Sequence, residues 1–224
     1  MAVEGVKAAV GLMSGTSMDG IDAAVVNTDG ERVFGFGPAQ TLVYDDEFRD
    51  RLRAVLGVDP DDSDESQAVA EELTHLHAEA VKRLLGDNDL KADAIDAIGF
   101  HGHTVIHKPD RGITRQIGDG ALLARETRIP VVSDFLAADV AGGGQGAPLA
   151  PLYHAALTRN LDKPLAVLNL GGVANVTWIS PDGGLIAFDT GRDDRSLCLA
   201  FKRHAGSRAK RRGPRGRDCR RTHR

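Results

Sequence analysis

Residues 7–28, KAAVGLMSGTSMDGIDAAVVNT, place two apolar runs on either side of a turn of small and polar residues. The runs 7–13 and 21–28 have the length and the Val/Ile/Ala content of buried strands, and the Gly/Ser cluster between them is a turn signal. The sequence therefore predicts a β-hairpin whose tip is the SGTS segment of residues 14–17. A third strand around residues 33–44 is expected to complete the opening sheet.

Helical and strand-like segments alternate along the rest of the chain. Residues 46–57 and 67–86 have helical spacing, and apolar residues recur near every 3.6 positions at Val69, Leu73, Leu76, Ala80 and Leu84. A strand that runs into a polar loop is expected in 94–105, a loop and helix in 115–129, a short buried strand in 130–135, a glycine-rich loop and helix in 141–157, and a strand–turn–strand unit in 164–179. This mixed order predicts an α/β domain.

Composition and charge favour a cytoplasmic protein with an unusual final segment. The start of the chain lacks the basic and apolar regions of a signal peptide, and no apolar run approaches the ~20 residues that span a bilayer. Both cysteines, Cys198 and Cys219, lie in residues 192–224, which also hold 13 of the 28 basic residues but only three acids. The other 191 residues contain 15 basic and 29 acidic residues, so the charge changes sign abruptly after residue 191.

The turn between the first two predicted strands is a candidate anion-binding loop. Small residues let backbone N–H groups approach an anion closely, the hydroxyls add donors, and a carboxylate can hold Mg²⁺. A structural tight turn of the same composition is an equal alternative. The segment is not a Walker A loop, because no Gly-Lys-Ser/Thr sequence closes it.

Three histidines lie close together in FHGHTVIH, residues 100–107. Their proximity invites a metal site, but no cysteine is nearby and the carboxylates are not at ligand spacing. A loop at a strand end that contacts a ligand is the preferred interpretation.

Two glycine-containing motifs follow in the second half of the chain. The run AGGGQGAP at 141–148 suits either a ligand-contacting loop or a flexible connection. The segment LNLGGVANV at 168–176 predicts a hairpin, and FDTG at 188–191 places Asp189 at the end of an apolar strand, a frequent position for a catalytic carboxylate. Aspartic proteases share Asp-Thr-Gly, but the strong helices here argue against a β-rich fold of that type.

Taken in order, the motifs GLMSGTSMDGID, FHGHTVIH, QIGDGALLA, VVSDF, GGGQGAPLAP, LNLGGVANVT and FDTG resemble the anhydro-N-acetylmuramic acid kinase family across residues 8–191. That family belongs to the superfamily of sugar kinases, heat-shock ATPases and actin. The resemblance implies a ribonuclease H-like, actin-like ATPase fold with a complete first domain in 1–163 and the start of a second in 164–191. Residues 192–224 are expected to form a basic, disordered tail outside the family.

The resemblance also implies an activity, which is ATP-dependent hydrolytic opening and phosphorylation of 1,6-anhydro-N-acetylmuramic acid to N-acetylmuramic acid 6-phosphate in cell-wall recycling. Asp189 would be the general base, and Asp19 would hold the Mg²⁺ of MgATP. The expected ATP-binding residues are Gly15, Thr16, Ser17, Met18, Asp19, Gly20, Ile21 and Asp22. Contacts to the sugar are expected from His101, His103, Thr104, Asp134 and Gln145. The resemblance also implies that the chain can form a homodimer.

This chain departs from the family pattern at a few positions. His103 replaces the Gln of His-Gly-Gln-Thr, Leu136 stands where an Arg follows Asp-Phe, and Gly142 replaces an Ala. After Gly191 the expected Pro-Gly-Asn sequence and the long second domain do not follow, and an Arg/Gly-rich segment does, as a reading-frame shift in a GC-rich gene would produce.

Three functions compete on these observations. An ATP-dependent sugar kinase leads, and a non-catalytic sugar-binding remnant of the same family is second. A tail that binds nucleic acid by counterion release is third, because 192–224 offers only Phe201 for base stacking.

Overall fold

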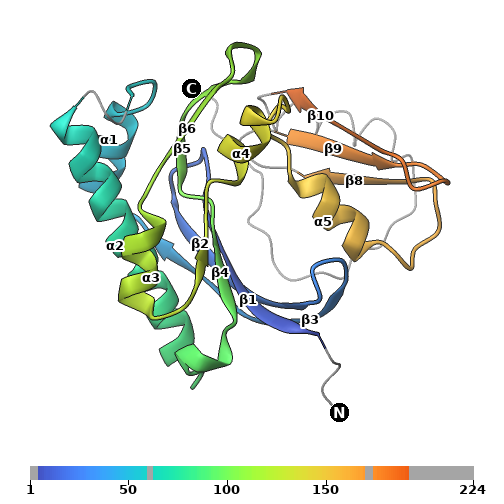
Figure 1. Ribbon diagram of the computed structural model, residues 1–224, viewed down its shortest axis with the longest axis horizontal. Helices are drawn as coiled ribbons and strands as arrows, with labels where there is room; N and C mark the ends of the chain where they lie inside the picture. Colours follow the sequence, from blue (N-terminus) through green and yellow to red (C-terminus); the bar gives the residue numbers. More distant parts are fainter. Residues whose placement is uncertain (1–4, 60–62, 170–173, 192–224) are drawn as a thin grey trace, which may run out of the picture.

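A computed structural model describes residues 5–59, 63–169 and 174–191. Figure 1 shows helices on both sides of a central sheet, with a smaller sheet at one side of the molecule. The elements in chain order are β1 (Lys7–Ser14), β2 (Gly20–Thr28), β3 (Val33–Val43), α1 (Asp46–Ala54), α2 (Asp64–Gly86), η2 (Ala92–Ala94), β4 (Ala97–Phe100), β5 (His103–Lys108), η3 (Pro109–Arg111), β6 (Ile113–Ile117), α3 (Gly120–Thr127), β7 (Val131–Val132), α4 (Phe135–Ala141), α5 (Ala150–Leu157), β8 (Leu165–Asn169), β9 (Ala174–Ile179) and β10 (Leu185–Gly191).

The central sheet has five strands in the order β3-β2-β1-β4-β7. Strand β2 is antiparallel to both β1 and β3, whereas β4 is parallel to β1 and β7 is parallel to β4. A three-stranded antiparallel meander that continues into parallel strands is the ribonuclease H-like arrangement, so the expected fold class is confirmed.

Helices α1, α2 and α3 lie on one side of this sheet, while α4, α5 and the small sheet β10-β9-β8 lie on the other (Figure 1). The core between α2 and the sheet contains fully buried side chains from both layers, among them Val10, Ile21, Leu73, Leu84 and Ile98. The long helix α2 begins at Asp64, three residues before the predicted start, because the Ser63 side chain accepts a hydrogen bond from the Ser66 N–H at 3.1 Å.

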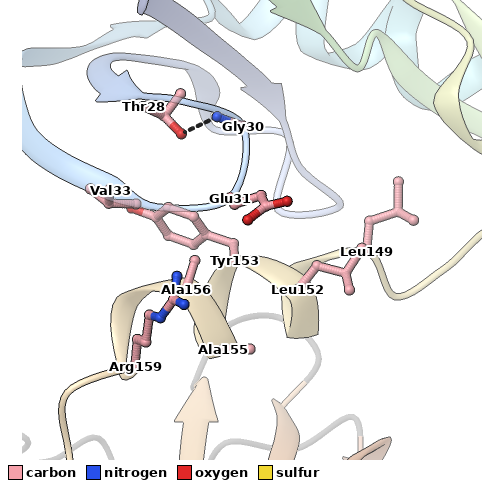
Figure 2. A pocket seen from close by; sticks show the side chains of 10 residues that line it. All are labelled: Thr28, Gly30, Glu31, Val33, Leu149, Leu152, Tyr153, Ala155, Ala156 and Arg159. Carbon is pink, nitrogen blue, oxygen red and sulfur yellow. Dashed lines mark hydrogen bonds between the residues drawn. The ribbon is translucent and has the colours of Figure 1, made fainter. Parts of the chain in front are cut away.

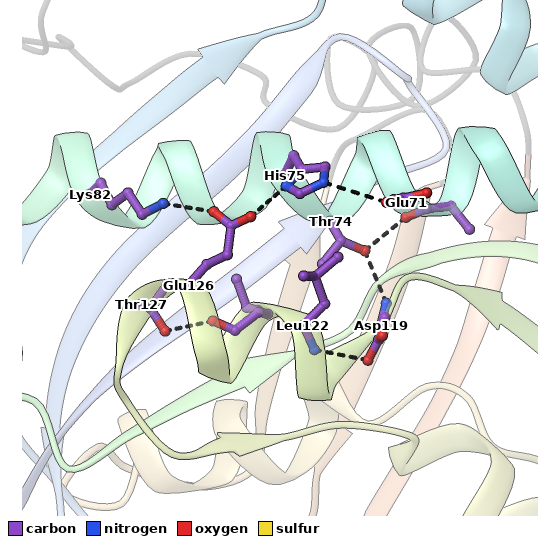
Figure 3. Close-up of polar contacts among 10 residues, drawn as sticks. Glu71, Thr74, His75, Lys82, Asp119, Leu122, Glu126 and Thr127 are labelled. Carbon is purple, nitrogen blue, oxygen red and sulfur yellow. Dashed lines mark hydrogen bonds and ion pairs between the residues drawn. The ribbon is translucent and has the colours of Figure 1, made fainter.

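Polar contacts fix α3 against α2 (Figure 3). The backbone N–H of Asp119 donates to Thr74 Oγ1 at 2.9 Å, and the Asp119 carboxylate caps α3 by accepting from Ala121 and Leu122. Toward the other end of α3, Glu126 bridges His75 and Lys82 of α2. The GDG sequence at residues 118–120 therefore has a structural role, because it starts α3 and positions that helix beside α2.

Two sequence expectations differ from the structure. The sequence predicts a buried strand in 130–135, but β7 comprises only Val131 and Val132, and Val132 is 55% exposed. The reason is that β7 is the edge strand of the sheet, so one of its sides is open. The polar loop expected after Phe100 is in fact a second hairpin, β5–β6, in which His103 pairs with Ile117.

Gly118 is a position where only glycine fits. Its φ is +124°, and a Cβ placed there would lie 2.5 Å from Cζ of the buried Phe100. We expect Gly118→Ala to lower the free energy of unfolding by at least about 3 kcal/mol, since backbone strain and overpacking add. Gly112 is the matched control: it also has a positive φ, +69°, but a Cβ added there would meet no atom within 4 Å. In urea unfolding, Gly112→Ala should lower the free energy of unfolding by only about 1–2 kcal/mol. Equal decreases in the two variants would contradict this explanation.

Candidate functional site

Three of the predicted motifs meet at one edge of the central sheet. Strands β1, β4 and β7 are parallel neighbours, with Leu12 opposite Phe100 and Gly99 opposite Val132. Their carboxyl ends therefore lie side by side, and the segments that follow them are the β1–β2 turn, the His101–Gly102 connection and the Ser133–Asp134 connection. In open α/β sheets, ligands bind outside the carboxyl ends of the parallel strands.

The β1–β2 turn presents its polar side chains to solvent. Thr16, Ser17 and Asp19 are exposed, and Ser17 Oγ donates to Asp19 Oδ1 at 2.6 Å. The Met18 N–H donates to the Gly15 carbonyl at 3.0 Å, and Met18 has a φ of 51°. Arg49 of α1 holds the outer side of the turn by donating from Nε to the Met18 carbonyl at 2.9 Å. The turn is thus fixed while its hydroxyls and carboxylate stay accessible.

The last residues of the predicted ATP-binding segment belong to the sheet itself. The Ile21 side chain is fully buried in the core, so Ile21 can offer a ligand only its backbone. Asp22 is exposed in β2, and its Oδ1 accepts a hydrogen bond from Thr41 Oγ1 of β3.

A buried chain of hydrogen bonds supports the turn from behind. The Tyr44 hydroxyl donates to Ser14 Oγ at 2.7 Å, and Ser14 Oγ lies 2.9 Å from Nδ1 of His103. All three residues are at most 3% exposed. Because Ser14 accepts from Tyr44, its single proton is free to go to His103 Nδ1, and this favours the neutral imidazole with its proton on Nε2. The chain joins the end of β1 to the start of β5.

Burial sets the charge state of this chain. It lowers the pKa of His103 from 6.5 to about 4, although the hydrogen bond to Ser14 opposes that shift, and nearby His101 lowers the pKa further. Burial likewise raises the pKa of Tyr44 above its usual value. Both groups are therefore neutral near pH 7, and the turn is supported by neutral hydrogen bonds rather than by an ion pair.

The residues predicted to bind the sugar differ in their exposure to solvent and in their contacts. His101 is half-buried directly after β4, and Thr104 accepts a hydrogen bond from Gln116 Nε2 at 3.2 Å. Asp134 is exposed at the start of α4 with a φ of 60°, and Gln145 is exposed in the glycine-rich loop. His103, at 2% exposure, offers almost no surface to a ligand and instead contacts Ser14.

Asp139 shapes the glycine-rich loop, a role that the sequence does not indicate. Its Oδ2 accepts from the Gly146 N–H at 2.7 Å, and its carbonyl accepts from the Gly144 N–H at 2.9 Å. Leu136, which stands in place of the family's Arg, is 5% exposed and lies in α4 beside this loop. The loop is therefore a folded structure rather than a flexible connection.

Asp189 lies in β10 opposite Asn175 of β9, and the register shifts between Asp189 and Gly191. Next to it, Thr190 Oγ1 donates to the Ala174 carbonyl at 3.1 Å. The side chain of Asp189 lies outside the described part of the structure, as do the predicted Gly171–Gly172 turn and the whole of residues 192–224.

Neither of the two cavities described contains a predicted site residue. The larger, about 640 Å³, lies between the β2–β3 turn and α5. Figure 2 shows Tyr153 of α5, and Arg159 just after that helix, across it from Glu31 and Val33. The second, about 410 Å³, lies between α2 and the start of α3. Among the described residues, no group of three His, Cys, Asp or Glu side chains is arranged to hold a metal ion, and no helix is long and apolar enough to cross a membrane.

Comparison with known proteins gives one consistent family. The family model described as "Anhydro-N-acetylmuramic acid kinase" matches residues 7–220. Proteins named anhydro-N-acetylmuramic acid kinase are similar to this chain at 54% identity in Acidiphilium cryptum (89% of this chain, 54% of the relative), 56% in Paramagnetospirillum magneticum (82% and 50%) and 52% in Rhodospirillum rubrum (88% and 52%). The chain thus spans about half the length of the curated relatives that it matches.

Two further observations come from these comparisons. The family match continues to residue 220, so the expected family boundary after residue 191 is not confirmed and stays a prediction. Similar solved structures include a reductive activator for corrinoid,iron-sulfur protein (11% identity, TM-score 0.38, 82% of this chain and 30% of that one) and YeaZ from Pseudomonas aeruginosa (15%, 0.30, 82% and 66%). Because both TM-scores are low, these two structures do not support the fold assignment, which rests on the strand order of the central sheet.

Proposed function

Since this chain belongs to the anhydro-N-acetylmuramic acid kinase family, we propose that it carries the phosphate-binding half of an ATP-dependent sugar kinase. The reaction is the hydrolytic opening of 1,6-anhydro-N-acetylmuramic acid and the phosphorylation of its freed C6 oxygen. The observation that carries this proposal is the meeting of the β1–β2 turn, His101 and Asp134 at the carboxyl edge of β1, β4 and β7.

The β1–β2 turn suits the phosphates of ATP. Thr16 and Ser17 offer hydroxyl donors in an exposed turn that ends at the buried Gly20, and Asp19 offers an exposed carboxylate. Mg²⁺ in phosphoryl-transfer sites is bound by one or two carboxylates together with phosphate oxygens and water, so Asp19 fits this ion. When bound, Mg²⁺ neutralises the charge that develops on the transferred phosphoryl group.

The buried chain behind the turn gives it a fixed shape. Phosphoryl transfer depends mainly on positioning and on donors that are oriented before the substrate arrives. Tyr44 and His103 hold Ser14, the residue that leads into the turn. In this proposal His103 is a positioning residue, and His101, Thr104, Asp134 and Gln145 remain the candidates for contact with the sugar.

Asp189 is the proposed general base. It accepts a proton from a water molecule, and the resulting hydroxide attacks the anomeric carbon of the sugar. The bond from that carbon to the bridging oxygen breaks, and the C6 oxygen attacks the γ-phosphorus as ADP leaves. The proton on Asp189 then passes to solvent, which balances the reaction of sugar, ATP and water to sugar 6-phosphate and ADP.

The domain limits, location and assembly of the chain also remain proposals. The five-stranded sheet corresponds to the first domain, 1–163, and β8–β10 to the start of the second, 164–191. Cytoplasmic location and a homodimer stay predictions.

ADP release measured with and without the anhydro sugar tests the function. Turnover that requires the sugar, and incorporation of ¹⁸O from labelled water at the anomeric carbon, are the expected results. Saturable binding of the sugar without ADP release would indicate a sugar-binding remnant instead. Release of ADP that is independent of the sugar would contradict the proposed substrate.

A further inference from the structure

The small sheet has one covered and one open side. On the covered side, Ile179 is 2% exposed and His154 Nδ1 of α5 lies 2.8 Å from Thr177 Oγ1 of β9. On the other side, cross-strand pairs bring together Trp178 with Ile186, and Val176 with Phe188. Ile186, Phe188 and Trp178 are 61%, 54% and 39% exposed within the described structure. We call Val176, Trp178, Ile186 and Phe188 the open apolar face.

The central sheet shows how this chain covers an equivalent face. Strands β1–β2–β3 and β8–β9–β10 are both antiparallel meanders with the second strand in the middle. In the first meander, the chain that follows β3 returns as α2 and packs on β2 and β3 (Figure 1). The buried residues on that side of the meander include Leu12, which pairs with Ala23, and Val10, which pairs with Val25.

The two meanders correspond strand by strand. When Gly15 is placed on Gly171 in the sequence, Val10 and Leu12 fall on Ala166 and Leu168. Ala166 pairs with Trp178 and Leu168 pairs with Val176, so these positions lie on the same side of the small sheet as the open apolar face. The face that α2 covers in the first meander is therefore the face that is open in the second.

The segment that follows β10 has one apolar run that could cover it. Residues 197–201, LCLAF, begin six positions after Gly191, and the rest of 192–224 is dominated by Arg, Lys and small residues. The five residues between can span about 17 Å, which is enough to turn back over neighbouring strands. Because the open apolar face is exposed to water, its burial against this apolar run is more favourable than its contact with the basic residues that follow.

We propose that residues 197–201 pack against the open apolar face of β8–β10, while the basic remainder of the chain stays in water. The contact would cover the strand that carries Asp189, so it would stabilise the proposed catalytic strand. It does not depend on the proposed function, because it requires neither ATP nor sugar. The expected disorder of 192–224 would then hold only for the part after residue 201.

Trp178 is the single tryptophan of the chain, so its fluorescence reports on this face alone. In the full chain we expect blue-shifted emission and weak quenching by acrylamide. Phe201→Asp should shift the emission to the red and increase quenching several-fold, whereas Ala209→Asp, the same substitution in the basic remainder, should change neither. Equal quenching in the full chain and in Phe201→Asp would overturn the proposal. Protection of Trp178 that appears only as protein concentration rises would also overturn it, because a second copy would then be the cover.

The two cysteines provide an independent readout with an internal control. Cys198 lies in the apolar run and Cys219 in the basic remainder. The rate of each thiol is compared with its own rate in urea, because the arginines beside Cys219 also affect its reactivity. Alkylation followed by mass spectrometry should show Cys198 slowed about tenfold in the native chain and Cys219 hardly slowed, because thiol reactivity depends on access. The slowing of Cys198 should vanish in Ile186→Asp, a change at an exposed position of the face. Equal slowing of the two thiols in the native chain would overturn the proposal.

Discussion

Asp189→Asn is expected to lower kcat for phosphorylation of the anhydro sugar by about 10²–10⁴-fold, the usual contribution of a general base. The amide has nearly the shape of the carboxylate but cannot accept the proton of the attacking water. Binding of ATP and of the sugar should change little, because the lost interaction belongs to the transition state. Asp189 pairs with Asn175 in β10, directly before the position where the register of the β9–β10 pair shifts.

Steady-state kinetics together with calorimetric binding of each ligand alone would measure this split. Asp182→Asn is the matched control, since Asp182 is exposed in the turn between β9 and β10 of the same hairpin. It should leave kcat unchanged. An Asp189→Asn variant that keeps its kcat but loses affinity for the sugar would contradict the general-base role.

Acid is expected to destabilise the fold through two buried histidines, at a cost of about 3 kcal/mol each between pH 7 and pH 4. Burial lowers the pKa of both His77 and His103 from 6.5 to about 4. His77 is fully buried in α2, its Nδ1 lies 2.7 Å from the Leu73 carbonyl, and its ring packs edge-on against Phe100. His101 adds a repulsion that further disfavours the charged form of both rings.

The folded and unfolded chains take up these protons at different pH values. The unfolded chain binds them as the pH falls through 6.5, whereas the folded chain does so only near pH 4, so stability is complete above pH 6.5 and is lost as the pH falls toward 4. Urea unfolding at a series of pH values measures the loss. His103→Gln should remove about half of the histidine-dependent loss, because an amide can still bond Ser14 but does not titrate. His107→Gln, an exposed position of the same hairpin, is the control. An unchanged pH dependence in His103→Gln would contradict this assignment.

Much of the fold could be predicted from local patterns. The hairpin of residues 7–28 and the helix around Leu73 and Leu84 follow from apolar periodicity, which the burial of these residues satisfies. The β5–β6 hairpin could not be predicted in the same way, because His103, Thr104 and His107 give a polar sequence with no clear alternation. Its first strand is held by pairing with residues 113–117, which are not adjacent in sequence.

The sequence predicts the parts of the site but not the contacts that support them. The turn at Gly15–Asp19 has a recognisable composition, and the parallel strands bring it beside His101 and Asp134. The contacts of Ser14 with Tyr44 and His103 join positions 30 and 89 residues apart, so no local pattern reveals them. For the same reason, the FHGHT motif alone predicts that His103 contacts the sugar. In the structure, however, His103 is buried behind the β1–β2 turn.

Titration of the ¹⁵N-labelled chain with MgATP, followed by amide NMR, tests most directly whether the β1–β2 turn binds phosphate. The predicted result is a saturable set of shifts centred on the amides of Gly15, Ser17 and Gly20, which weakens in Asp19→Asn as the Mg²⁺ contact is lost. Tripolyphosphate should shift the same amides, since the phosphates rather than the base make the contact. Shifts centred instead on Gly30 and Arg159, beside the large cavity of Figure 2, or no saturable shifts at all, would contradict it.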